Sequence, residues 1–352
     1  MLTSASTGRA RVVQVRAIAL LVASTLLAVG CSSNSGGAAS DGATKVHMAS
    51  GSLTALPTLP AQIAIAKGYF KDEGLDVTID DVKAGSKALQ ALLAGQVEVT
   101  VGFYEHTIQS AVKGQQIRSF VDLTTMPGYA LVVSPGSVGQ VRTLTDLKGK
   151  SVGVSAPGSA TDFFLKFLLS RAGVPADSVP AVGIGIGPSS VAAVERNQVA
   201  ASVLYDPALT AVLTKHPGLT VLGDARDPAK AQQVFGADSY PSMTLYAKTT
   251  WLDQHADTAR KLATAIRKAD QYLHSASVDE ITASLSKETV GPDVAQFKQV
   301  LAATIPYIST NGTIDAKGAE AVATVLGQTD PAIKAANLDP ANYYTNDLLQ
   351  AN

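Results

Sequence analysis

Two stretches of the chain, GSKALQALLAGQVEVTV at residues 85–101 and GPSSVAAVERNQVAASV at residues 187–203, carry one pattern twice. In each stretch a glycine opens a helix, at residues 85–93 and 187–195, and a strand follows at residues 97–101 and 199–203. With a constant offset, Phe103 just after the first stretch falls on Tyr205 just after the second. Few residues are identical, so the shared order of elements is what indicates two similar α/β lobes.

Alternating strands and helices lead into both stretches. We predict a strand, a helix and a strand before each of them, at residues 45–50, 57–67 and 75–79 and again at residues 151–155, 157–169 and 179–186. This alternation predicts parallel pairing through right-handed crossovers. The chain after Tyr240 starts no third copy, and we expect it to pack onto an existing lobe. In it we predict a strand at 242–247 and helices at 251–274, 277–285, 292–304 and 316–326.

The N-terminal region has the features of an export signal. Three arginines precede an uncharged apolar run from Ala17 to Val29, which is too short to span a bilayer as a stable helix. The run ends in LAVGC at residues 27–31, which resembles the lipobox of bacterial lipoproteins. We therefore expect residues 1–30 to be removed, Cys31 to be lipidated, and residues 31–44 to be a flexible Gly/Ser-rich tether. The alternative is a signal peptide without lipidation.

Composition excludes several classes of function. Without residues 1–30 the chain has 25 basic and 29 acidic residues, a net charge of −4, which gives no reason to expect nucleic-acid binding. Cys31 is the only cysteine, so neither an intramolecular disulfide nor a thiolate metal site is possible. The histidines are scattered and indicate no metal site. No G-x-S-x-G, P-loop or H-E-x-x-H motif is present.

The candidate ligand-binding residues lie where predicted strands end. In open parallel sheets, ligands bind at the carboxyl ends of strands, beside helix N-termini that favour anionic or oxygen-rich groups by about 0.3–1 kcal/mol each. Applied to both lobes, this rule selects Ser52, Leu53, Ser86, Tyr104, Glu105, His106, Ser159, Thr161, Tyr205 and Asp206.

Each kind of residue in this set has an alternative structural role. Ser159 and Thr161 could be helix caps, and Tyr104 and Tyr205 could be core packing. Glu105 and the histidine after it could form a salt-bridged pair at the surface.

Four motifs together resemble a known family. They are AIAKGYFKDEGLDV at 64–77, ALLAGQVEV at 91–99, DLKGKSVGV at 146–154 and PGS at 157–159. In this order they resemble the ABC-transporter substrate-binding proteins of the nitrate/sulfonate/taurine type, which are related to the thiamine-pyrimidine-precursor binding proteins. The resemblance covers the chain from about Lys45 to the C-terminus.

The resemblance implies a two-lobed α/β architecture, the periplasmic-binding-protein type II fold. Each lobe would be a mostly parallel sheet flanked by helices, and two crossing strands, here at 129–134 and 242–247, would join the lobes. Lobe 1 would contain residues 45–128 plus 242–352, and lobe 2 residues 129–241. The lobes would close on a solute by a hinge motion that the solute biases.

The resemblance also implies function and partners. The chain would be an exported, lipid-anchored monomer that captures a small-molecule solute outside the cytoplasm, without a cofactor, and delivers it to an ABC permease and its ATPase. A sulfonate or taurine-like solute is the first expectation, and a pyrimidine thiamine precursor, nitrate, or a sensor role for a signalling receptor are the alternatives. Eukaryotic relatives that make the thiamine pyrimidine carry a cysteine-rich segment absent here, so we do not expect an enzyme.

Overall fold

The computed structural model describes residues 42–226 and 228–349. The predictions for Cys31, for the signal peptide and for the tether up to residue 41 lie outside the described residues. Among the residues that are described, no helix is both long and apolar enough to cross a membrane.

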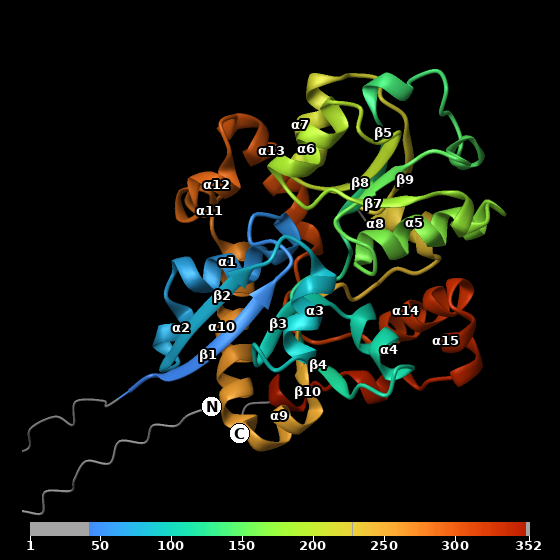
Figure 1. Cartoon of the computed structure of the whole chain (residues 1–352). Helices are drawn as coiled ribbons and strands as arrows, with labels where there is room; N and C mark the ends of the chain where they lie inside the picture. Colours follow the sequence, from blue (N-terminus) through green and yellow to red (C-terminus); the bar gives the residue numbers. More distant parts are fainter. Residues whose placement is uncertain (1–41, 227, 350–352) are drawn as a thin grey trace, which may run out of the picture. The chain divides into compact units, whose positions relative to one another are not determined.

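Strands and helices alternate through the first two thirds of the chain, and helices dominate the last third (Figure 1). The strands are β1 (Thr44–Ser50), β2 (Leu75–Asp81), β3 (Val99–Phe103), β4 (Ile117–Asp122), β5 (Tyr129–Val133), β6 (Val152–Val154), β7 (Ala181–Gly183), β8 (Ala201–Tyr205), β9 (Val221–Asp224) and β10 (Met243–Lys248). The α-helices are α1 (Leu59–Ala66), α2 (Tyr69–Asp72), α3 (Gly85–Leu93), α4 (Glu105–Ala111), α5 (Ala160–Arg171), α6 (Pro188–Glu195), α7 (Ala208–Lys215), α8 (Pro228–Phe235), α9 (Thr249–Gln254), α10 (Ala256–Ser275), α11 (Val278–Ser284), α12 (Lys287–Val290), α13 (Val294–Thr304), α14 (Ala316–Thr329) and α15 (Pro331–Ala336).

The strands form two five-stranded sheets with matching topology. The first has the order β2-β1-β3-β10-β4 and the second β7-β6-β8-β5-β9. In both, the first three strands are parallel and the last two pairings are antiparallel. The chain passes from the first sheet to the second between β4 and β5, and returns before β10. The predicted α/β fold with two flanked sheets is confirmed, and both segments predicted to cross are strands.

The internal repeat is confirmed by equivalent strands. β3 and β8 keep the offset found in the sequence, since Val99 corresponds to Ala201 and Phe103 to Tyr205. Each of these strands lies at the centre of its own sheet. Phe103 and Tyr205 therefore occupy the same position in the two sheets, at the carboxyl end of the central strand.

Side-chain alternation along the central strands buries both faces of each sheet. On β1, Met48 enters the core shared with α1 and α10, while Ala49 packs with α3 on the opposite face. On β5, Leu131 packs on the α5 side and Val132 on the side of α6 and α7. Both sheets are therefore three-layered, and their strand ends are left free to build a site.

The helical tail differs from the prediction in two ways. The predicted helix at 251–274 breaks at His255, whose φ of −128° and ψ of 36° are not helical and whose Nδ1 lies 3.0 Å from the carbonyl oxygen of Trp251. The tail also contacts helices of both sheets, because α14 packs against both α4 and α5. In Figure 1 the red α14 lies beside α4, and residues of α12 and α13 line one cavity together with residues of α6 and α7.

Two shorter differences concern the strands. The predicted strand at 179–186 is reduced to β7, since its glycines leave the extended backbone at Gly185, where φ is 74°. β3 and β8 each begin two residues later than predicted and extend through Phe103 and Tyr205.

Candidate functional site

Two adjoining cavities lie at the carboxyl ends of strands from both sheets. The smaller has a volume of about 20 Å³ and is lined by residues such as Ser52 after β1, Phe103 on β3, Ser159 before α5 and Tyr205 on β8. The larger has a volume of about 400 Å³. Ala55, Ile186 and Tyr205 line both cavities. The rule that places ligands at strand ends therefore selects the region in which the two sheets meet.

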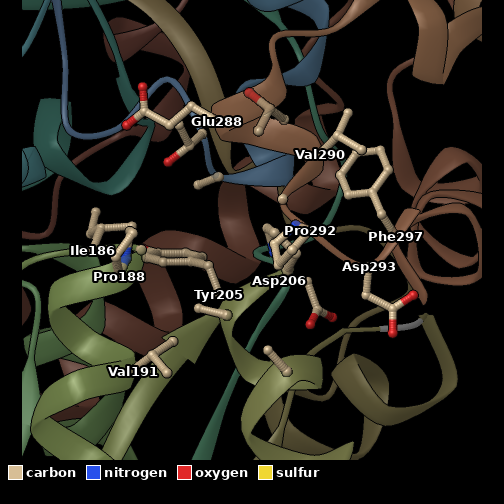
Figure 2. A pocket seen from close by; sticks show the side chains of 18 of the residues that line it. Ile186, Pro188, Val191, Tyr205, Asp206, Glu288, Val290, Pro292, Asp293 and Phe297 are labelled. Atoms are coloured by element: carbon tan, nitrogen blue, oxygen red, sulfur yellow. The ribbon is translucent and has the colours of Figure 1, made fainter. Parts of the chain in front are cut away.

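The larger cavity has one wall from the second sheet and one from the helical tail. Figure 2 shows Tyr205 on β8 and Val191 on α6 on one side, and Val290 on α12, Phe297 on α13 and Pro292 between these two helices on the other. The sequence reasoning missed this second wall, because the rule considers only strand ends and α12–α13 follow no strand.

Carboxylates line the larger cavity, and cations lie just outside it. Its acidic residues are Glu195, Asp206, Glu288 and Asp293. Three of them have a basic neighbour, with nitrogen–oxygen distances of 2.7 Å for Lys215 to Glu195, 3.9 Å for Lys83 to Glu288 and 3.9 Å for Arg226 to Asp206. These basic groups are within 4 Å of the acids but are not among the residues that line the cavity.

Ser86 and Ser159 lie on helix starts from different sheets and contact each other directly. The Ser159 Oγ accepts a hydrogen bond from the Ser86 backbone N–H at 2.9 Å and donates to the Ser86 Oγ at 3.1 Å. Ser159 makes no side-chain cap to α5, so its hydroxyl serves the contact between the sheets and not capping. A second contact runs from the Leu56 N–H to the Asp206 carbonyl oxygen at 3.1 Å. The two sheets are therefore joined at the predicted ligand loops.

Ser52, Leu53 and Thr161 make local contacts. The Thr161 Oγ1 accepts from the backbone N–H of Ser155 at 2.8 Å and so fixes the loop between β6 and α5. The Ser52 Oγ lies 3.1 Å from the hydroxyl of Thr54, and the Leu53 N–H donates to Asp81 at 3.3 Å. Of the three, Ser52 lines the smaller cavity, and the other two line neither of the two cavities described above.

Tyr104 and His106 turn into the interior of the protein. Tyr104 donates through its hydroxyl to the carbonyl oxygen of Pro340 at 3.0 Å, so the core alternative holds for this residue. The His106 Nδ1 lies 3.1 Å from the Tyr246 hydroxyl, and burial lowers the pKa of the imidazole to about 4. The alternative of a surface pair with Glu105 is wrong, because both side chains are buried.

Glu105 is a buried carboxyl group without a hydrogen bond. Neither of its carboxylate oxygens has a partner among the described residues, and burial raises its pKa to about 8. Three tyrosines, Tyr129, Tyr205 and Tyr240, lie close enough that a charge on Glu105 adds to the effect of burial in raising their pKa values. Of these, Tyr129 and Tyr240 have hydroxyls that also lack a partner in the described part of the chain.

Aromatic rings from both sheets gather beside Glu105. The ring centroids of Phe103 and Tyr205, the repeat-equivalent pair, lie 6.1 Å apart, and Tyr129 lies 5.9 Å from the first and 5.5 Å from the second. Tyr129 was not among the predicted site residues, because it opens an apolar run that predicts only a buried strand. Its position opposite Tyr205 in the register of β5 and β8 is what brings it here.

Asp206 is held at the base of the larger cavity. Its Oδ1 accepts from the Thr210 N–H at 2.8 Å, and its Oδ2 lies 3.9 Å from Arg226. Burial raises its pKa more than these two partners lower it. Asp206 therefore places a carboxyl group, held by its own helix start, at the cavity wall.

Comparison with known proteins gives one family and one fold. The family model described as NMT1/THI5 like matches residues 58–277. A solved structure of a protein from Bordetella bronchiseptica RB50 is 34% identical with a TM-score of 0.84, and the match covers 87% of this chain and 96% of that chain. The MOPS-bound alkanesulfonate-binding protein SsuA from Xanthomonas axonopodis pv. citri is 16% identical with a TM-score of 0.65, covering 87% of this chain and 99% of that chain. At that identity the likeness shows a shared fold, the periplasmic-binding-protein fold.

An enzyme also appears among the relatives. The 4-amino-5-hydroxymethyl-2-methylpyrimidine phosphate synthase THI11 of Saccharomyces cerevisiae is 22% identical over 220 residues, which are 61% of this chain and 63% of that protein. The match thus spans less than two thirds of the synthase.

Proposed function

This chain belongs to the NMT1/THI5-like family, and we propose that it is the extracytoplasmic solute-binding protein of an ABC importer. The observation that carries the proposal is that the two repeat-equivalent sheets meet at their strand ends. There Ser86, in α3 beside the first sheet, is hydrogen-bonded to Ser159, just before α5 beside the second sheet. A solute bound between the sheets would replace or reinforce that contact. Binding would thereby shift the balance between open and closed forms.

The proposed lobes follow the chain's two passages between the sheets. Lobe 1 consists of residues 45–128 plus 242–352 and lobe 2 of residues 129–241. The protein named SsuA, whose fold this chain shares, is an alkanesulfonate-binding protein, and this supports capture of a small organic solute as the task of the fold. The lobes work as a hinge in this proposal, and the closed form docks on a permease.

Cys31 is the proposed site of attachment. A diacylglyceryl group on this residue has two acyl chains, which favours stable membrane attachment. The tether that follows raises the effective concentration of the binding lobes beside the permease. Intact-mass analysis of the membrane fraction tests this part, and an uncleaved or unmodified N-terminus overturns it.

Binding without turnover is the proposed activity, although one relative is named as a synthase. The sequence has a single cysteine, at position 31, and so lacks the cysteine-rich segment expected of eukaryotic relatives that make the thiamine pyrimidine. That relative nevertheless favours a second candidate, the binding of a pyrimidine precursor. Consumption of any bound solute by the purified protein would contradict binding without turnover.

The test is a thermal-shift screen of the full chain against sulfonates, nitrate, aromatic acids and pyrimidines. A true ligand at 100 times its Kd is expected to stabilise the folded protein by about 2.7 kcal/mol. A screen of these compounds together with benzamidine in which no solute raises the Tm overturns the proposal.

A further inference from the structure

The chemistry of the two cavities bears on the class of solute, and the inference that follows rests on the proposed solute-binding function. An anion such as a sulfonate is usually held by arginine, lysine or free N–H groups. No lysine or arginine lines either cavity within residues 42–226 and 228–349. The three cations that neighbour cavity acids are already paired, Lys215 with Glu195, Lys83 with Asp81 and Arg226 with Asp224, each at 2.7 Å.

The hydroxyls expected to hold an anion are also occupied. Ser159 uses its Oγ on Ser86, and Thr161 uses its Oγ1 on the backbone N–H of Ser155. The backbone N–H of Ser86, at the start of α3, is taken by the same Ser159 hydroxyl. These two hydroxyls and this N–H are therefore used in contacts within the protein, and an anion that took them would have to displace those contacts.

Unpartnered acceptors gather on the other side of the junction. Both carboxylate oxygens of Glu105 and the hydroxyls of Tyr129 and Tyr240 are buried without a partner among the described residues. Buried polar atoms in native proteins are nearly always hydrogen-bonded, so such a concentration requires an explanation. Tyr205 connects this cluster to the cavities, since it packs against Tyr129 at 5.5 Å and lines both of them.

We propose that Glu105 determines the specificity of the cleft, and that the solute is a planar organic cation of the aromatic amidine class. When the sheets separate, its N–H groups donate to the Glu105 carboxylate and to the hydroxyls of Tyr129 and Tyr240. Its ring packs against Phe103 and Tyr205, the repeat-equivalent pair. The larger cavity, at about 400 Å³, lies within the size range of small-molecule sites, about 300–1,000 Å³, and is the route by which the solute reaches Tyr205.

Binding of a cation by Glu105 has a proton signature. The pKa of about 8 leaves the carboxyl group mostly protonated at pH 7, and a cation beside it favours the ionised form. The neighbouring titratable groups add no proton release at pH 7. Tyr129, Tyr205 and Tyr240 stay protonated because their pKa values are raised, and His106 stays neutral because its pKa is lowered to about 4. Binding at pH 7 should therefore release about 0.9 proton per site.

The experiment is isothermal titration calorimetry of the full chain at pH 7 in two buffers of different ionisation enthalpy. The probes are benzamidine, benzenesulfonate and benzyl alcohol, which share a ring and differ in charge. We expect benzamidine to bind most tightly, with release of about 0.9 proton. Glu105→Gln should weaken it at least tenfold and abolish the release. The matched control Glu320→Gln, an exposed glutamate on α14, should change neither.

Any result other than these overturns the inference. Tighter binding of benzenesulfonate contradicts the charge preference, and benzamidine binding that Glu105→Gln leaves unchanged contradicts the role of this residue. A chain that binds a solute of the thermal-shift screen but not benzamidine overturns the inference and leaves the proposed function standing. A chain that binds no solute overturns both.

Discussion

Replacing Glu105 by glutamine should stabilise the folded protein, although it removes a charged residue type from a candidate site. The carboxyl group has a pKa of about 8 when buried and an ordinary value of 4.5. At pH 7 the ionisation of Glu105 therefore stabilises the unfolded chain, whereas in the folded chain the carboxyl group stays mostly protonated. Between the ordinary pKa of 4.5 and pH 7 lie about 2.5 pH units. At about 1.4 kcal/mol per unit, the unfolded state is stabilised by about 3 kcal/mol. The glutamine side chain has the same size and no such preference for the unfolded state.

The sign of the pH dependence follows from the raised pKa. Below pH 4.5 both states hold the proton, and Glu105 has no effect on stability. As the pH rises toward 8, the unfolded state loses the proton first, so the wild type loses stability that Glu105→Gln keeps. The advantage of the variant should be under about 1 kcal/mol at pH 5 and about 3 kcal/mol at pH 7.

The assay is urea unfolding of wild type, Glu105→Gln and the control Glu320→Gln at both pH values. Three other buried carboxyls with raised pKa values, Asp122, Asp206 and Asp270, also make the wild type pH-dependent, so the difference between the two chains is what isolates Glu105. An advantage of the variant that is the same at pH 5 and pH 7 would refute the reasoning.

Three further changes test packing and contacts. A Cβ at Gly102 would lie 2.7 Å from the ring of Tyr246, so Gly102→Ala should lower the free energy of unfolding by about 1–3 kcal/mol. A Cβ at Gly327 in α14 would have ordinary van der Waals contacts, so Gly327→Ala should raise the free energy of unfolding by up to about 1 kcal/mol. Ser277→Ala removes the capping box of α11 and should cost about 0.5–2 kcal/mol in urea unfolding; no change would mean that the cap is not formed in solution. Ser159→Ala removes the two hydrogen bonds that the Ser159 hydroxyl makes between the sheets, so small-angle X-ray scattering should give a larger radius of gyration than for wild type, and an equal radius would contradict a closing role for this serine.

The fold could be predicted because its signals are local and occur twice. Helix α3 has the predicted bounds Gly85–Leu93, and the offset between β3 and β8 in the structure is the one visible in the sequence. The rule about strand ends selects both Ser86 and Ser159, since each lies at a helix start after a strand, but their contact with each other is seen only in the structure. The ligand-binding role of the selected residues stays a prediction.

The surroundings of the site residues and the second cavity wall could not be predicted, because they depend on tertiary packing and a local sequence pattern does not determine it. Glu105 and His106 are neighbours in sequence, yet one lies among tyrosines and the other against Tyr246, because successive residues of a helix point in different directions. The wall formed by α12 and α13 depends on how the tail after β10 packs over the second sheet. Nothing in the amphipathic pattern of a helix states which surface it covers.

The strand order has a consequence for how the chain is made. β10 lies between β3 and β4, and it is the only neighbour of β4 in the first sheet. Residues 117–122 must therefore wait for residues 243–248, about 120 positions later in synthesis, before they can join a sheet. The first sheet, begun earliest, is completed only after every strand of the second has been made. A chain that crosses a membrane before folding benefits from this order, because its N-terminal part cannot finish folding while the rest is still in transit.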